Sequence, residues 1–201
     1  AEPPSDGDFE QLPNRLIAHG ALAEDISPTR VTLRGAFKGG DDALEWLARI
    51  PDLDTIYISE TKLTGEGLNH FSRLKKLRRL SITHTGISPE AVKHVSRLPL
   101  TSLSLHGVAL GEAQMQRIAD LMMLEWHSIS GPEIDDAAID PLLAMGSLER
   151  LDLYNTSLTD KGVAKLKALT GLKRLSVEGS KQVSDAALKK LVGLKSLRLL
   201  D

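Results

Sequence analysis

Residues 148–159 read LERLDLYNTSLT, and this stretch carries the pattern that decides the fold. Its first three leucines occupy the first, fourth and sixth positions, so apolar and polar side chains alternate as in a strand with one buried face. The same spacing recurs every 23 to 25 residues, with units that begin at Leu53, Leu77, Leu100, Leu124, Leu148, Leu172 and Leu197. A fixed period of this size predicts a solenoid, in which each unit buries its apolar face against its neighbours.

A short helix is expected after each strand. In the unit from Leu148, the stripe of Val163, Leu166 and Leu169 has helical spacing, and Gly171 ends the helix. We expect helix caps at Thr64, Ser88, Gly111, Asp135, Thr159 and Ser184. A small residue usually precedes each stripe, as at Gly67 and Gly162, and is expected to let the helix approach the strand closely.

These residues carry a resemblance to leucine-rich repeat proteins. The unit LxxLxLxxTx[LIV][ST][DP]x[GA][LV]xxLxxL is similar to that of a bacterial subtype and covers residues 28–201. The resemblance implies an α/β fold, a right-handed horseshoe-shaped solenoid with a parallel sheet on its concave side and short helices on its convex side. It also implies a ligand-binding role, usually toward protein. With a degenerate unit around Val31 and Leu33, residues 27–201 would hold seven to eight repeats.

Residues 1–26 do not fit the repeat, and we interpret them as a polar N-terminal segment and cap. Phe9, Leu12, Leu16 and Ile17 could form an amphipathic helix closed by Gly20, and Ile26 could pair near the first strand. The chain starts at Ala1 without Met. This start fits either an exported protein, periplasmic or extracellular, after signal-peptide removal, or a cytoplasmic fragment.

The last residues of the chain, 197–201, read LRLLD and fall within a predicted strand. An uncovered parallel edge with exposed leucines invites pairing. Two interpretations follow: the natural protein continues, or this open C-terminal edge supports self-association.

Composition and motifs argue against several functions. The net charge of −2 gives no general attraction to nucleic acid, and no apolar run is long enough to span a membrane. Absence of Cys removes disulfides and thiolate metal sites. No phosphate loop, zinc-peptidase motif or nucleophile elbow occurs. We therefore expect no enzyme activity, catalytic residue, cofactor or metal, although Glu60, His84 and His106 should be neighbours.

The concave face is the expected binding surface, because the third, fifth, seventh and eighth positions of each unit point away from the core. The predicted ligand-binding residues are Tyr57, Arg79, His84, His106, Trp126, Arg150, Tyr154 and Arg174. Tyr, Trp and Arg dominate binding hot spots, although aromatic residues also simply favour exposed strand positions. The arginines would favour an acidic partner, and Glu60, Asp152 and Glu178 would oppose it.

His127 occupies a position that leucine holds in the other units, and two interpretations are open. It is either a neutral core histidine with hydrogen-bond partners, or the strand bulges so that Met123 and Trp126 enter the core.

The leading hypothesis is a non-enzymatic module that binds a protein or peptide on the concave face. One alternative is a structural scaffold that assembles through the solenoid ends. Another is glycan recognition, with Trp126 and the tyrosines stacking on sugar rings.

Overall fold

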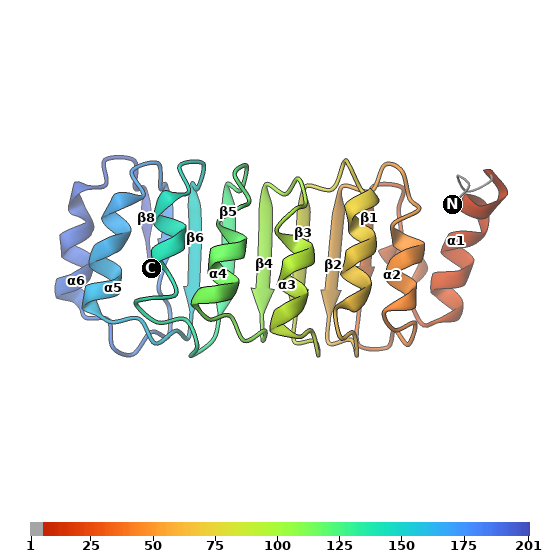
Figure 1. Ribbon diagram of the computed structural model, residues 1–201, viewed down its shortest axis with the longest axis horizontal. Helices are drawn as coiled ribbons and strands as arrows, with labels where there is room; N and C mark the ends of the chain where they lie inside the picture. The colour runs from red at the N-terminus through yellow and green to blue at the C-terminus, as the bar shows by residue number, and fades with distance from the viewer. Residues whose placement is uncertain (1–5) are drawn as a thin grey trace.

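Eight parallel strands form one sheet whose order follows the sequence, as the repeat predicted (Figure 1). A computed structural model describes the backbone of residues 6–201 and the side chains from residue 11 onward. The strands are β1 (Arg30–Leu33), β2 (Thr55–Ser59), β3 (Arg79–Thr83), β4 (Ser102–His106), β5 (Trp126–Ser130), β6 (Arg150–Tyr154), β7 (Arg174–Ser176) and β8 (Leu199–Leu200). The first leucine of each unit lies two residues before its strand, and those from Leu53 to Leu172 are almost fully buried.

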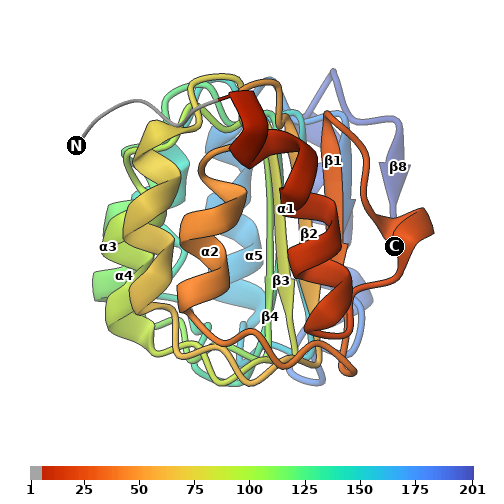
Figure 2. The same cartoon turned by 90° about the vertical axis from the view of Figure 1, so that its right-hand side faces the viewer.

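Short helices form a second layer on one side of the sheet (Figures 1 and 2). They are α2 (Asp42–Leu47), η2 (Glu66–Arg73), η3 (Pro89–Ala91), α3 (Val92–Val95), α4 (Glu112–Ile118), η4 (Asp140–Ala144), α5 (Asp160–Lys165), η5 (Leu166–Ala168), α6 (Asp185–Lys189) and η6 (Lys190–Gly193). Those labelled η are 3₁₀ helices, the tighter form suited to short pieces. The predicted apolar stripes, such as Val163, Leu166 and Leu169, lie in the core between the two layers.

The sheet is concave on the side away from the helices. Figure 2, an end view, shows β1 and β8 farther from the helix layer than β3 and β4. The α/β leucine-rich-repeat solenoid expected from the sequence is therefore confirmed. The side chains at the third, fifth and seventh positions of each unit line this concave face.

Helix α1 (Asp6–Ala18) covers the N-terminal end of the core (Figure 2). Its Leu12 and Leu16 are buried, whereas Ile17 is 41% exposed, and the side chain of Phe9 lies outside the described residues. Gly20 follows with a positive φ of 95°. After the 3₁₀ turn η1 (Ala23–Asp25), Ile26 forms an antiparallel bridge with Val31 of β1, next to the strand where it was expected.

The start of β5 is regular, so of the two interpretations of His127 the core histidine is confirmed and the strand bulge is wrong. His127 pairs in register with Leu103 and Leu151, is fully buried, and leaves Met123 55% exposed. Its Nδ1 lies 3.1 Å from the carbonyl oxygen of Leu103, while Nε2 has no partner among the described residues. Burial lowers the pKa of His127 to about 4, against the opposing effect of the Leu103 bond, so the imidazole is neutral at pH 7.

Aspartates at the start of the helical segments join neighbouring repeats. Asp136 Oδ1 accepts a hydrogen bond from the Thr159 backbone amide (2.9 Å), and Oδ2 accepts from the Thr159 hydroxyl (2.6 Å). Asp160 accepts the same two bonds from Ser184, both 2.7 Å, and these bonds lower the pKa of Asp160. Asp41 accepts the equivalent pair from Thr64. We call these three contacts the aspartate clamps.

The predicted caps are partly confirmed. The hydroxyls of Thr159 and Ser184 accept bonds from Lys161 N and Ala187 N, and Asp135 accepts from Ala137 N and Ala138 N. At Gly111 the contact is reversed, because its amide donates to Gln114 Oε1. Thr64 and Ser88 form no side-chain cap, since η2 starts after Gly65 and Ser88 lacks the bond.

The small residues before the helix stripes have a different role from the one expected. A Cβ added to Gly162 would lie 2.1 Å from Asp136 Oδ1, and one added to Gly67 would lie 2.4 Å from the Asp41 carbonyl oxygen. Both contacts are with the preceding repeat rather than with the strand of the same unit. Absence of a side chain therefore permits close stacking of repeats and preserves the aspartate clamps.

The backbone turns through the left-handed region just after most strands, at the eighth position of the unit. Gly107, Gly131 and Gly179 have positive φ there, as glycine readily does. Glu60 (55°), His84 (49°) and Asn155 (52°) adopt the same conformation with a side chain present. For Glu60 and His84 this conformation is strained.

Candidate functional site on the concave face

The sheet register brings the predicted site residues into columns that cross the strands. Arg79, Ser102, Trp126, Arg150 and Arg174 align along one column. The next column contains Tyr57, Ser81, Ser104, Ser128, Asp152 and Ser176, and a third contains His106, Ser130 and Tyr154. His84 follows β3 and is exposed beside them.

Trp126, Arg150 and Asp152 form one hydrogen-bonded cluster across β5 and β6. The indole Nε1 of Trp126 donates to Asp152 Oδ2 at 2.8 Å, and Arg150 Nε donates to the same oxygen at 2.7 Å. The Arg150 guanidinium also lies over the Trp126 ring, with its carbon 4.3 Å from the ring centroid. Because the cation and the ring on which it stacks each donate one bond to the same carboxylate, both are held in one orientation before any ligand arrives.

Asp152 lies in the concave-face column where the sequence placed it, but its side chain is covered instead of exposed. It is fully buried because Trp126 and Arg150 bond to it from the flanking positions. Its second oxygen, Oδ1, has no hydrogen bond among the described residues, and Arg174 Nε lies 4.0 Å away. A buried carboxylate is favourable only next to cations and donors, so Asp152 requires both arginines.

His106 forms a second, smaller contact group. Its Nε2 lies 3.1 Å from Ser128 Oγ, and its ring centroid lies 5.8 Å from that of Tyr154. Partial burial lowers the pKa of His106, and His84 lowers it further, while Asp152 acts in the opposite direction. His106 is therefore neutral at pH 7 and acts as a polar, uncharged group in this surface.

A small hollow lies in the middle of the concave face. Its volume is about 90 Å³. The floor is made by small side chains of β3 and β4, and larger side chains stand around it: the lining is Tyr57, Arg79, Leu80, Ser81, Ser102, Ser104 and Trp126. The hollow thus brings Tyr57 and Arg79 together with Trp126, and through Trp126 with Arg150.

Sequence reasoning missed Asp152 and Ser128 as parts of this site. The available signal was the register itself: Asp152 lies in the column between Ser128 and Ser176, whose side chains leave room, and beside a column with Trp126 and two arginines. Position-by-position analysis of one strand cannot show that large residues of adjacent strands cover a smaller one.

The site has no arrangement typical of a catalytic centre. Ser128 contacts His106 but is only 4% exposed, and the nearby Asp152 bonds to Trp126 and Arg150 instead of orienting the histidine. A nucleophile needs an accessible oxygen and a base oriented by a third group. Across the part of the chain that the structure describes, no three His, Asp or Glu side chains gather as metal ligands.

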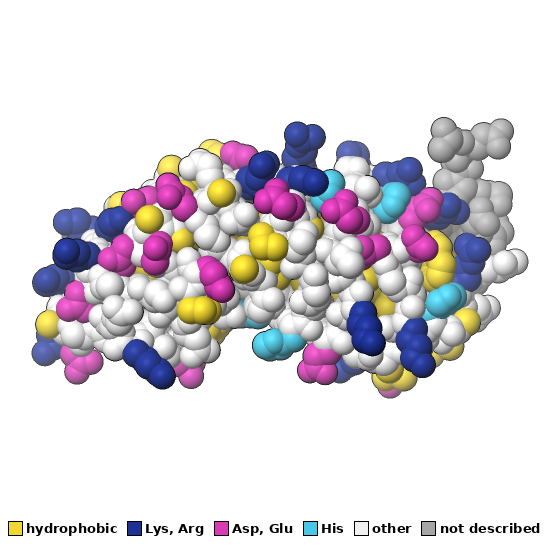
Figure 3. All heavy atoms as spheres, turned by 60° about the horizontal axis from the view of Figure 1, so that its bottom comes forward, with side chains coloured by type: hydrophobic (Ala, Val, Ile, Leu, Met, Phe, Trp, Pro, Cys, Tyr) yellow, Lys and Arg dark blue, Asp and Glu magenta, His cyan; other side chains and the backbone are white. Residues whose placement is uncertain are grey.

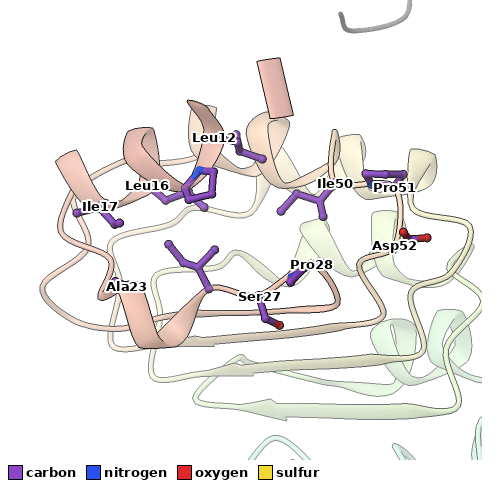
Figure 4. A pocket seen from close by; sticks show the side chains of 11 residues that line it. Leu12, Leu16, Ile17, Ala23, Ser27, Pro28, Ile50, Pro51 and Asp52 are labelled. Atoms are coloured by element: carbon purple, nitrogen blue, oxygen red, sulfur yellow. The ribbon is translucent and has the colours of Figure 1, made fainter. Parts of the chain in front are cut away.

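A larger pocket of about 510 Å³ lies at the N-terminal end, away from the concave columns (Figure 4). Helix α1, the segment around Ile26 and the turn at Ile50 and Pro51 enclose it, and only Ser27 and Asp52 add polar side chains. Its apolar lining continues the core under α1. None of the residues that line this pocket also lines the hollow at Tyr57, Arg79 and Trp126.

On the side shown in Figure 3, acidic and basic side chains are interspersed and hydrophobic ones form small separate spots. Within residues 6–201, no helix is both long and apolar enough to cross a bilayer.

Comparisons with solved structures confirm the fold. The chain is similar to internalin C2 from Listeria monocytogenes, with 16% identity and a TM-score of 0.54, over 81% of this chain and 75% of that one. It is also similar to a leucine-rich repeat protein from Leptospira interrogans, with 22% identity and a TM-score of 0.54, over 77% of this chain and 38% of that one. No protein-family model and no curated protein matches the sequence. The expected leucine-rich-repeat architecture is confirmed at the level of fold.

Proposed function

We propose that this chain is a non-enzymatic module that binds a protein or peptide on its concave face. The binding surface would extend from Tyr57 and Arg79 across the serine-floored hollow to Trp126 and Arg150, with Tyr154 and His106 beside it. His84 and Arg174 would contribute at its margins.

The cluster of Trp126, Arg150 and Asp152 is the observation that carries the proposal. Trp and Arg supply most binding energy when they are rigid and have both a large apolar area and free donors. Here their orientation is fixed by Asp152 and by their own stacking. Binding of a ligand would therefore cost little side-chain entropy at Trp126 and Arg150, because both side chains are already fixed.

The fold supports the same conclusion. Solenoids present extended concave surfaces that suit other macromolecules better than small molecules. The one histidine–serine contact of this surface, between His106 and Ser128, is largely closed to solvent. These features favour binding over catalysis.

A capture experiment tests the proposal. The wild-type chain, a Tyr57→Ala/Tyr154→Ala variant and a Met122→Ala/Met123→Ala variant would be immobilised and exposed to native lysate and envelope fractions. Met122 and Met123 are exposed in the loop between α4 and β5, so this control removes apolar area elsewhere. We expect a protein captured by the wild type and the control but not by the tyrosine variant.

Equal capture by all three chains would contradict a concave site. Capture that survives protease treatment of the lysate but is lost after glycosidase treatment would instead favour glycan recognition.

A further inference from the structure

Two arginines on the concave face are each held by a hydrogen bond from Nε, and Arg79 Nη2 also lies 4.0 Å from Asp54 Oδ1. Arg79 Nε donates to Thr55 Oγ1 at 3.1 Å, as Arg150 Nε donates to Asp152. The terminal nitrogens of both guanidinium groups form no hydrogen bond within the described part of the chain. The side chains of Arg79 and Arg150 are 56% and 34% exposed, so their terminal nitrogens keep donors available for a carboxylate.

The charge of this face differs from that of the whole chain. The column that contains Arg79 also holds Arg30, Arg150 and Arg174 and no acidic residue, while the chain carries a net charge of −2. Asp152 offsets one of these charges, and Asp54 and Asp201 lie about 4 Å from Arg79 and Arg174. Four arginines next to three aspartates leave one net positive charge along the column, which favours an anionic partner.

The spacing of the two arginines selects an extended peptide. Arg79 and Arg150 belong to the same column, three strands apart, which corresponds to about 14 Å at the usual strand separation. In an extended peptide that crosses the strands, residues i and i+4 point the same way and are about 13 Å apart. Residue i+2 then points toward the hollow between Arg79 and Trp126.

We propose that the partner presents an extended acidic segment, with carboxylates at positions i and i+4 bound by Arg79 and Arg150 and a small aliphatic side chain at i+2 in the hollow. This inference rests on the proposed function of the concave face. A flat anionic membrane fits less well, because a bilayer surface cannot follow a concave sheet.

The direct test is fluorescence anisotropy with a synthetic heptapeptide and the full chain. The peptide carries Glu at its second and sixth positions, Val at the fourth, Thr elsewhere, blocked ends and an uncharged dye. Its first comparison peptide has Gln in place of both Glu residues. The second has Glu at positions two and five, which point to opposite sides of an extended chain. We expect each comparison peptide to bind about tenfold more weakly or worse.

Matched protein variants locate the contact. Arg79→Gln and Arg150→Gln should each weaken binding of the Glu peptide about tenfold, whereas Arg117→Gln, an equal charge loss on exposed α4, should leave it unchanged. Arg79 is 56% exposed at its side chain and bonds to neutral Thr55, so its variant remains informative even if Arg150→Gln destabilises the fold around Asp152.

Three results would overturn the inference. They are equal binding of the Glu and Gln peptides, equal loss in all three arginine variants, and binding to phosphatidylserine vesicles in place of the peptide. If the tyrosine variant still loses its captured protein while Arg79→Gln and Arg150→Gln retain it, the concave site stands and only the acidic-segment inference fails. If the tyrosine variant also retains the captured protein, both the concave site and the acidic-segment inference fail.

Discussion

Trp126 and Asp152 are joined across two strands by a 2.8 Å hydrogen bond from the indole nitrogen to a fully buried carboxylate. The bond makes the orientation of the half-buried Trp126 depend on a charge beneath the surface. Changes at Asp152 should therefore affect both folding and binding, although Asp152 is too deeply buried for a ligand to reach.

Asp152→Asn tests this dependence through stability. The substitution leaves Arg150 beside a neutral amide and removes the charge that both arginines face, so we expect the free energy of unfolding to fall by about 2–4 kcal/mol. Urea unfolding followed by circular dichroism measures it. Asp120→Asn, at an exposed position, is the control and should change stability by less than about 0.5 kcal/mol. An equal effect of the two substitutions would refute the structural role of Asp152.

His127→Leu should stabilise the protein and flatten its response to acid. The pKa of His127 is about 4 in the folded chain and 6.5 in a model compound, so the unfolded state takes up the proton first. The contribution of neutral His127 to the free energy of unfolding is therefore fully present above pH 6.5. It is lost as the pH falls toward 4, by on the order of 3 kcal/mol. Leucine also removes the unpartnered Nε2. Unfolding curves at pH 7, 5.5 and 4.5 check the effect, with exposed His84→Ala as the comparison; a parallel pH response of His127→Leu and wild type would exclude this origin.

His84→Gly should raise the free energy of unfolding by about 0.5–1 kcal/mol, because His84 has a φ of 49° that glycine adopts without strain. Thr85→Gly is the matched change at a neighbour without positive φ and should lower stability by a similar amount. Thermal unfolding distinguishes them. Destabilisation by both substitutions would mean that the histidine side chain contributes more than its backbone conformation costs.

Gly162→Ala should destabilise the chain by about 2 kcal/mol or more, because the new Cβ would lie 2.1 Å from Asp136 Oδ1 and disturb its clamp to Thr159. Gly146→Ala adds the same atom where nothing lies within 4 Å and should be tolerated. Urea midpoints of the two variants, measured side by side, decide the matter. Similar midpoints would show that the repeats can separate enough to accept the methyl group.

Much of the fold could be predicted because the repeat imposes it. Leucines such as Leu148 and Leu151 occupy equivalent buried positions in successive units, so period and phase alone predict strand, turn and core. Helix type was less predictable. The 3₁₀ form of η2, for instance, depends on a turn with Gly65 at a φ of 99° that the stripe spacing does not encode.

The candidate site was predictable only as a set of outward positions. The sequence identifies Trp126 and Arg150 as neighbours in one column, but not that both bond to Asp152. The regular strand at His127 likewise depends on a contact between neighbouring strands. The carbonyl oxygen of Leu103 pairs with His127 Nδ1 and makes a core histidine tolerable. Such contacts depend on side-chain conformations across strands, which a one-dimensional pattern does not contain.

The aspartate clamps have a consequence for protein engineering. Each clamp is divided between two units, since the carboxylate of Asp136 or Asp160 belongs to one repeat and the hydroxyl of Thr159 or Ser184 to the next. A single transplanted repeat would carry half a clamp at each junction and leave its aspartate without the amide and hydroxyl that donate to it. Shuffled or lengthened versions of this solenoid should therefore be cut at the start of a helix, as between Thr159 and Asp160, because the pairs Asp136–Thr159 and Asp160–Ser184 then each stay within one cassette.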